Sequence, residues 1–207
     1  MRYIVLGYGK FGRLAVERLH AAFSSISVTV VERDRAQITG RQPAGVTVLQ
    51  EDATAFLLRS QLVTPEAVII PMVPFHLAAS YIKAREPECR DTPLPDNLME
   101  VTPNPLRLDE ATLCCSKSDF LCPDDCPEGD TCTVTGLPRT PLYCDLEALR
   151  IPGFTLLIQR SGQILPGIGG YPFKDLQSMA LKIHSGKYVV ATSCKCHAIM
   201  TGLEMNE

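Results

Sequence analysis

Short apolar segments and amphipathic segments alternate along the first 85 residues. The apolar runs are typical of strands buried on both faces of a parallel sheet, and they lie at residues 3–6, 26–31, 45–50 and 67–70. The amphipathic segments have apolar residues at helical spacing, and they lie at residues 11–19, 55–62 and 77–84. This order predicts an α/β fold with a Rossmann-like, doubly wound and mostly parallel sheet of about six strands and right-handed crossovers.

The turn after the first apolar run has the spacing G-x-G-x-x-G, and an acid, Glu32, closes the second run. Each part has a role in binding a dinucleotide. Gly7 makes the tight turn, Gly9 lets a pyrophosphate approach the backbone, and Gly12 lets helix and strand pack closely. The N–H groups and the dipole of the following helix favour phosphate. Glu32 can accept hydrogen bonds from a ribose diol and would repel a 2′-phosphate, so NAD or an adenine nucleotide (AMP or ATP) is favoured over NADP. Glycines used for tight packing alone are the alternative interpretation.

The second half begins with a change of composition. Residues 86–153 hold ten of the sixteen prolines, and six cysteines lie between positions 114 and 144, which predicts an irregular insertion with a cross-link that holds it or a function. The α/β pattern then returns, with strands expected at 154–159 and 188–191, a helix at 173–183, and a closing helix that follows residues 192–197 and runs through 203. We therefore expect three parts: a Rossmann nucleotide-binding core (1–85), a Pro/Cys-rich insertion (86–153), and C-terminal strands and helices that complete the α/β domain (154–207).

Cysteines form two short motifs in this second half. Cys122 and Cys126 form a C-x3-C turn, and Cys194 and Cys196 form a C-x-C pair followed by His197. The pair would lie at the N-terminus of the expected closing helix, where the dipole favours thiolate. Four soft ligands from two segments suit a structural zinc or an iron–sulfur cluster, so these four cysteines are the predicted metal ligands. Disulfides, thiol redox chemistry without a metal, and free buried cysteines are the alternatives.

Composition narrows the class of protein. A chain of 207 residues with 45% apolar residues can form one large domain, or one domain with a substantial insertion. A net charge of −3 gives no general attraction to nucleic acid, and no apolar run approaches the roughly 20 residues that span a membrane. The first run is interpreted as a strand rather than a signal peptide. We expect a cytoplasmic protein, in which nine cysteines favour metal or redox chemistry over structural disulfides.

Three segments carry a family resemblance: V-L-G-Y-G-K-F-G at 5–12, V-V-E-R-D at 30–34 and E-D-A-T at 51–54. Over about residues 1–85 the chain resembles the N-terminal NAD- or nucleotide-binding domain of Trk/Ktr-type (RCK) potassium-transport regulators. The family often has Asp where this chain has Glu32, and Gly where it has Glu51. The resemblance implies that Glu32 binds the adenosine ribose and that Asp52 lies beside the adenine. The expected nucleotide-binding residues are Gly7, Tyr8, Gly9, Lys10, Phe11, Gly12, Glu32, Arg33, Asp52 and Ala53.

Two functions from different classes fit these features. The first is a regulatory or sensor protein that binds NAD(H) or an adenine nucleotide and has a cysteine-ligated metal site; a simple variant has a purely structural zinc. The resemblance favours this function and implies a protein partner such as a transporter, and a homodimer. The second is an NAD-linked oxidoreductase that uses an iron–sulfur cluster or redox-active cysteines. No catalytic pair is recognisable. His76 would lie near the nucleotide crevice, although a polar residue there is also ordinary at the start of a helix.

Overall fold

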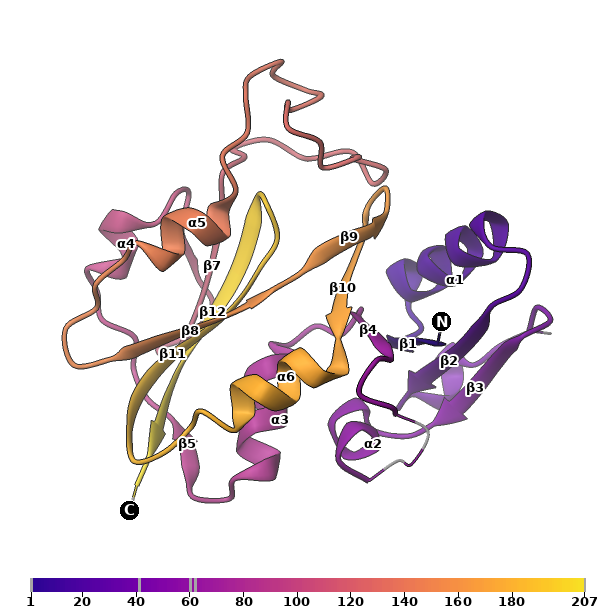
Figure 1. Ribbon diagram of the computed structural model, residues 1–207, viewed down its shortest axis with the longest axis horizontal. Coiled ribbons are helices and arrows are strands. Elements are labelled where there is room, and N and C mark those ends of the chain that lie inside the picture. The colour runs from indigo at the N-terminus through magenta and orange to yellow at the C-terminus, as the bar shows by residue number, and fades with distance from the viewer. Residues whose placement is uncertain (1, 41, 60, 62, 207) are drawn as a thin grey trace.

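The computed structural model describes residues 2–40, 42–59, 61 and 63–206, which form two β-sheets with helices packed around and between them (Figure 1). Residue 62, the expected end of one helix, lies outside the described residues. No helix in the described part of the chain has both the length and the apolar character needed to cross a membrane.

The first sheet has six strands in the order β3–β2–β1–β4–β10–β9. Its four parallel strands are β1 (Arg2–Leu6), β2 (Ser27–Glu32), β3 (Val46–Gln50) and β4 (Val68–Pro71). The two antiparallel strands at its other end are β10 (Ile168–Pro172) and β9 (Gly162–Leu165). The predicted fold class, a mostly parallel Rossmann-like sheet whose last strands come after the insertion, is confirmed.

Helices cover both faces of the parallel strands. They are α1 (Lys10–Ala22), α2 (Ala53–Arg59) and α3 (Leu77–Arg85). The short 3-10 helix η1 (Arg35–Gln37) follows β2 and buries none of its residues. Alternate residues of β1 face opposite sides of the sheet, so Val5 packs with α1, whereas Ile4 and Leu6 pack with α2 and α3. Because both faces are covered, residues 3–6 of β1 form an unbroken apolar run.

The second sheet joins the insertion to the end of the chain. It has the order β6–β7–β12–β11–β8, and β5 also pairs with β12. These strands are β5 (Cys89–Asp91), β6 (Leu106–Arg107), β7 (Thr112–Ser116), β8 (Thr155–Arg160), β11 (Gly186–Ser193) and β12 (His197–Met205). The insertion is therefore more regular than expected: it supplies β5, β6, β7 and two short helices, α4 (Leu98–Val101) and α5 (Leu142–Glu147). Residues 117–141 form its irregular part.

The closing helix expected after residues 192–197 was wrong, because this segment is the strand β12. Residues 194–196 form the turn of a β11–β12 hairpin, in which Cys194 N–H donates to the His197 carbonyl (2.9 Å). Strand β12 lies between β11 and β7, where pairing on both sides overrides the helical interpretation of a short apolar run. The helix dipole expected at the C-x-C pair is therefore absent from this hairpin turn.

The two sheets share one core. Helices α3 and α6 (Phe173–Ala180) lie between them (Figure 1). A single buried cluster includes Leu6 of the first sheet, Ile82 and Leu176 of these helices, and Val190 of the second sheet. The half that contains the glycine turn and the cysteine-rich half are consequently packed against each other rather than joined by a linker.

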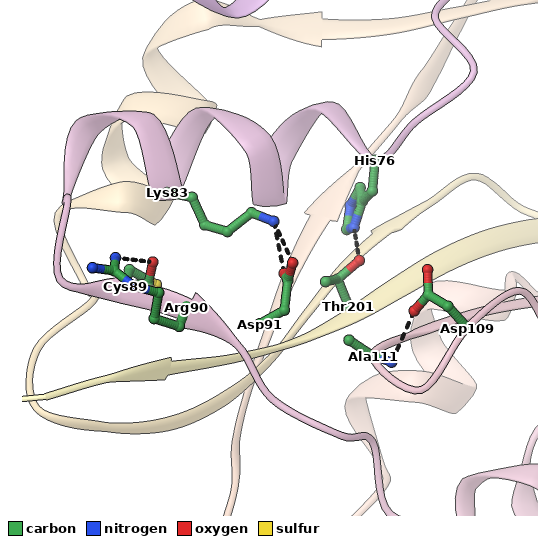
Figure 2. Close-up of polar contacts among 8 residues, drawn as sticks. All are labelled: His76, Lys83, Cys89, Arg90, Asp91, Asp109, Ala111 and Thr201. Atoms are coloured by element: carbon green, nitrogen blue, oxygen red, sulfur yellow. Dashed lines mark hydrogen bonds and ion pairs between the residues drawn. The ribbon is translucent and has the colours of Figure 1, made fainter.

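His76, directly before α3, forms polar contacts with the second sheet at the junction between the two halves. Its ring nitrogens lie 2.9 Å from the hydroxyl of Thr201 and 2.9 Å from that of Thr192, and Figure 2 shows the first of these contacts. Burial, with a smaller contribution from Lys83, lowers the pKa of His76 to about 3, so the ring is neutral. Lys83 adds an ion pair to Asp91 at 2.7 Å. The structure therefore gives His76 a role in joining α3 to the second sheet.

Candidate functional site: a nucleotide crevice beside a thiol-lined cavity

The three glycines of the first turn differ in what surrounds them. A Cβ at Gly7, which has a φ of +97°, would lie 2.4 Å from the Met72 carbonyl oxygen, and a Cβ at Gly12 would lie 2.1 Å from the Gly7 oxygen. The fold itself therefore requires glycine at these two positions. A Cβ at Gly9 would meet no atom within 4 Å. Packing does not explain Gly9, whereas the approach of a phosphate group to the backbone does.

Gly9 is also the N-cap of α1, and no side chain caps this helix end. The helix has 13 residues, so its dipole and its first-turn N–H groups point at the open space beside Gly9. Lys10 and Phe11, the first two helical residues, are exposed. The turn thus presents backbone donors and one lysine to the crevice above the carboxyl ends of β1 and β4.

Glu32 connects the end of β2 to this turn. Its carboxylate accepts hydrogen bonds from the backbone N–H of Tyr8 (2.6 Å) and of Asp34 (2.7 Å). A carboxylate has about four lone-pair sites, so two remain for ribose hydroxyls. The geometry is therefore compatible with the expected ribose contact.

The remaining residues expected to bind the nucleotide differ in their burial and in their hydrogen-bond partners. Tyr8 is buried: its hydroxyl lies 2.6 Å from Gln42 Oε1, and its ring lies under the Arg13 guanidinium at 4.6 Å. Asp52 accepts a hydrogen bond from Ala55 N–H (2.9 Å) at the start of α2, and Ala53 is buried in that helix. Arg33 is exposed beside Glu32. Tyr8 and Ala53 are thus part of the packed interior, whereas Arg33 is exposed to solvent.

A cavity of about 350 Å³ lies between α1, the end of β4 and the cysteine motifs. Its lining includes Phe11 and Leu14 of α1, Pro71 at the end of β4 and the next residue, Met72. The lining also contains His197 and all four cysteines predicted as metal ligands: Cys122, Cys126, Cys194 and Cys196. The structure therefore brings the C-x3-C and C-x-C motifs, about seventy residues apart in the sequence, to one place.

His197 lies between two of these thiols. Its Nε2 is 3.9 Å from Cys122 Sγ, and its Nδ1 is 3.7 Å from Cys194 Sγ. Burial raises the pKa of Cys194 to about 12, raises that of Cys196 and lowers that of His197. The thiols of Cys194 and Cys196 are therefore protonated, and the imidazole of His197 is neutral, in this form. Among the described residues, no three His, Cys, Asp or Glu side chains are grouped closely enough to hold one ion.

Contacts from the irregular loop position the C-x-C turn. Glu128 accepts a hydrogen bond from Lys195 N–H (2.7 Å), and the Lys195 ammonium lies 3.0 Å from Asp130. The backbone N–H of Cys196 and of His197 donate to Cys194 Sγ at 3.4 and 3.3 Å. The sequence gives no local signal for these two contacts, because acidic residues in a proline-rich loop are usually solvated.

The loop between Cys122 and Cys126 is bonded directly to α1. Arg18 donates from Nη1 to the carbonyl oxygens of Asp124 and of Pro166, both at 2.7 Å. Lys10 Nζ lies 3.9 Å from the Asp124 carboxylate. The Cys126 carbonyl accepts from Gln163 Nε2 (2.7 Å) in β9. One helix therefore has the open phosphate-type turn at its N-terminus and the cysteine loop along its side.

The fold and the turn define the first half as a Rossmann-type nucleotide-binding domain. Residues 3–72 match the model of the TrkA-N domain, which confirms the resemblance to the N-terminal domain of Trk/Ktr-type regulators. Residues 61–206 match the family model AF_1314_C, described as "Uncharacterized protein, C-terminal domain", and the chain belongs to this family.

One curated relative comes from Archaeoglobus fulgidus and is described as "Uncharacterized protein". It is 32% identical over 87 residues, which are 42% of this chain and 40% of the relative. The match thus spans well under half of that protein's length. No solved structure matches the chain.

Proposed function

We propose that this protein is a sensor that binds NAD(H) or an adenine nucleotide at its glycine turn and couples that binding to a metal held by Cys122, Cys126, Cys194 and Cys196. The TrkA-N match suggests a nucleotide-binding regulatory role. The resemblance also suggests that the signal passes to a protein partner such as a transporter, with the sensor as a homodimer.

Three features support the nucleotide site. Gly9 is open where packing does not require a glycine, the α1 N-terminus has no side-chain cap, and Glu32 keeps lone pairs free for a ribose. Phosphates would accept from the first-turn N–H groups, with Lys10 beside them. Asp52 would lie by the adenine, as the resemblance implies.

The donor set supports a soft metal. Four thiols and one imidazole line one cavity, and thiolate and imidazole are the ligands that zinc and iron–sulfur centres use. Ligation requires each thiol to release its proton to water, so the raised thiol pKa values predict that loading is favoured at higher pH. Bound there, zinc would brace the irregular loop, whereas a cluster could also exchange an electron.

The contact of Arg18 and Lys10 with the Cys122–Cys126 loop carries the sensor hypothesis. Any ligand that fixes this loop also fixes α1, and any phosphate at Gly9 competes with Asp124 for Lys10. Each ligand would then change the affinity for the other by the same factor.

An NAD-linked oxidoreductase is the second candidate, and one observation favours it. The thiols face Pro71 and Met72 at the carboxyl end of β4, where a dinucleotide crossing the switch point places its second nucleoside. Iron with sulfide in the protein, together with oxidation of NADH, would favour this alternative.

The first test is calorimetric titration with NAD+, NADH, AMP and ATP. Gly9→Val should weaken binding of the preferred nucleotide at least about 100-fold, because a side chain there displaces the phosphate. Its thermal midpoint should match that of the natural protein, because the Cβ meets no atom. Gly129→Val, at another open glycine, is the matched control and should bind normally. Unchanged affinity in Gly9→Val would refute the site.

A further inference from the structure

Strand β8 forms an open edge of the second sheet. In the described part of the chain it pairs with β11 alone, and no strand lies along its other edge. Its three central residues, Leu156, Leu157 and Ile158, are apolar and only partly buried. At the opposite edge of this sheet, β6 has only two residues. A longer apolar edge strand such as β8 is a template for pairing with another chain.

The backbone groups at this open edge belong to alternate residues of β8. Ser161 N–H donates to the Ser193 carbonyl of β11 (2.8 Å), and the two strands are parallel. Backbone groups of successive residues in a strand point to opposite edges, so Leu157 also faces β11. Leu156 and Ile158 therefore present their N–H and carbonyl groups to the open edge.

A cavity lies on each side of this strand. Leu156 and Ile158 line a cavity of about 460 Å³ together with the end of α5 and the segment that follows it. Leu157 and Gln159 line another cavity, of about 300 Å³, together with α6. Figure 1 shows α5 and α6 on opposite sides of β8. An added strand points its side chains alternately to the two faces of a sheet, so both cavities offer them room.

Helix α6 carries two opposite charges beside the edge. Asp175, Ser178, Met179 and Lys182 line the second cavity, and they are spaced as on one face of a helix. Asp175 and Lys182 are exposed, and neither forms an ion pair in the part of the chain that the structure describes. Lys182 lies just before Gly186, where β11 begins beside the N-terminal end of β8. Asp175 therefore lies towards the C-terminal end of β8.

We infer that β8 pairs with β8 of a second copy of this chain, antiparallel and about a two-fold axis through Leu157. The second sheet would then run continuously through both copies. The inference rests on the homodimer of the proposed function and assigns its interface, but it depends on neither the nucleotide nor the metal.

The register centred on Leu157 makes β8 complementary to itself. It places Leu156 opposite Ile158 of the second copy, and because these residues have the outward backbone groups, about four N–H···O bonds can form across the axis. Apolar side chains then face one another on both sides of the sheet, with Leu157 opposite its own copy. An axis at Ile158 would instead set Leu156 opposite Arg160, whose carbonyl already accepts from Gln159 Nε2 (3.1 Å).

The same axis brings opposite charges of the two α6 helices together. Antiparallel pairing puts the C-terminal end of β8 beside the N-terminal end of the other copy, so Asp175 of each copy faces Lys182 of the other. Complementary charges of this kind fix register and select the partner. Arg160, at the end of β8, donates from Nε to Glu147 (2.9 Å), so its charge is balanced within each copy. A second copy therefore matches this edge in backbone, apolar surface and charge.

The test is sedimentation equilibrium of the full chain over a wide concentration range, with charge-reversal variants. Lys182→Glu or Asp175→Lys should each weaken the dimer about 10-fold, because the attractive pairs become repulsive. The variant that carries both changes should recover the affinity of the natural protein. Lys174→Glu, at an exposed lysine of α6 outside the cavity lining, is the matched control and should dimerise normally.

A second variant tests the strand itself. Ile158→Lys places a charge at the paired edge, which blocks strand pairing, and should weaken the dimer at least about 100-fold. Val48→Lys, at a partly buried residue of the edge strand β3, is the control for the cost of a half-buried lysine and should remain dimeric. Circular dichroism checks that each variant folds. In the natural protein, hydrogen exchange at the N–H groups of Leu156 and Ile158 should slow as the dimer forms.

The outcomes separate the interface from the homodimer itself. If the natural protein dimerises and both Lys182→Glu and Ile158→Lys dimerise equally well, the dimer uses another surface and the inference is wrong. If the natural protein is monomeric throughout the concentration range, the homodimer of the proposed function and the inference fail together. Protection of the Leu156 and Ile158 N–H groups only in the presence of another protein would assign β8 to that partner and would also overturn the inference.

Discussion

The two halves of the molecule maintain their shapes in different ways. In the first half, neighbouring strands are joined by short helical crossovers, and continuous apolar runs such as Ile4–Leu6 are buried on both faces of the sheet. In the second half, residues 117–141 bury little: Leu121 is 96% exposed, and Leu137 and Val134 are also exposed. Polar contacts from Arg18, Glu128 and their neighbours hold this loop instead. The first half is thus shaped by burial, whereas the loop depends on contacts that a ligand can strengthen.

The largest expected effect concerns the junction between the halves. His76 has a pKa of about 3 in the folded protein against 6.5 when unfolded, so the unfolded chain binds the proton more tightly. The stabilisation is complete above pH 6.5 and is lost as the pH falls towards 3, by about 3 kcal/mol between pH 7 and pH 4. Urea unfolding at several pH values measures this. His76→Gln should remove that pH dependence, whereas His184→Gln, at an exposed histidine, should keep it. Equal slopes in the two variants would contradict the role given to His76.

The second prediction concerns metal removal, which should affect the two halves differently. Removing the bound metal by chelation should lower the free energy of unfolding by about 2.7 kcal/mol, relative to protein in free metal at about a hundred times the metal dissociation constant. Hydrogen exchange should accelerate in residues 117–141 and in the turn at 194–197, because these segments carry the ligands. Strands β1 to β4 should exchange as before, because their burial is independent of the loop. Cys194→Ser, which lacks a ligand, should not respond to the chelator. An equal change throughout the chain would contradict the contrast between the halves.

Sequence periodicity predicted the elements whose structure is determined by burial. The four parallel strands and α1 to α3 follow from apolar patterns within each segment, and the requirement for Gly7 and Gly12 follows from the turn itself. The strands at 154–159 and 188–191 were also predicted, but not their place in a second sheet. Strand pairing depends on contacts between distant segments, which a local pattern does not encode. For the same reason, β12 was misread as a helix.

Only part of the candidate site could be predicted from the sequence. Cysteine chemistry pointed to Cys122, Cys126, Cys194 and Cys196, and the structure places all four in the lining of one cavity. The contact of Arg18 with the cysteine loop joins residues more than a hundred positions apart, so no local pattern could predict it.

The smallest expected effect is the coupling between the two halves. Arg18→Ala removes two charge-assisted hydrogen bonds between α1 and the cysteine loop but touches neither ligand site directly. Nucleotide and metal should each still bind, while their mutual influence falls from about tenfold towards none. Arg59→Ala is the control, because Arg59 pairs with Glu51 on the other side of the sheet from α1. An Arg18→Ala protein that retains full coupling would show that the signal takes another path.

The most direct measurement of the central claim is the nucleotide dissociation constant of the natural protein, determined by calorimetry with and without bound metal. The account predicts a change of about tenfold, and the same factor in metal affinity when nucleotide is present, because linkage is reciprocal. Equal nucleotide affinities in the metal-free and metal-loaded protein would contradict it, and the two halves would then be independent sites on one shared core.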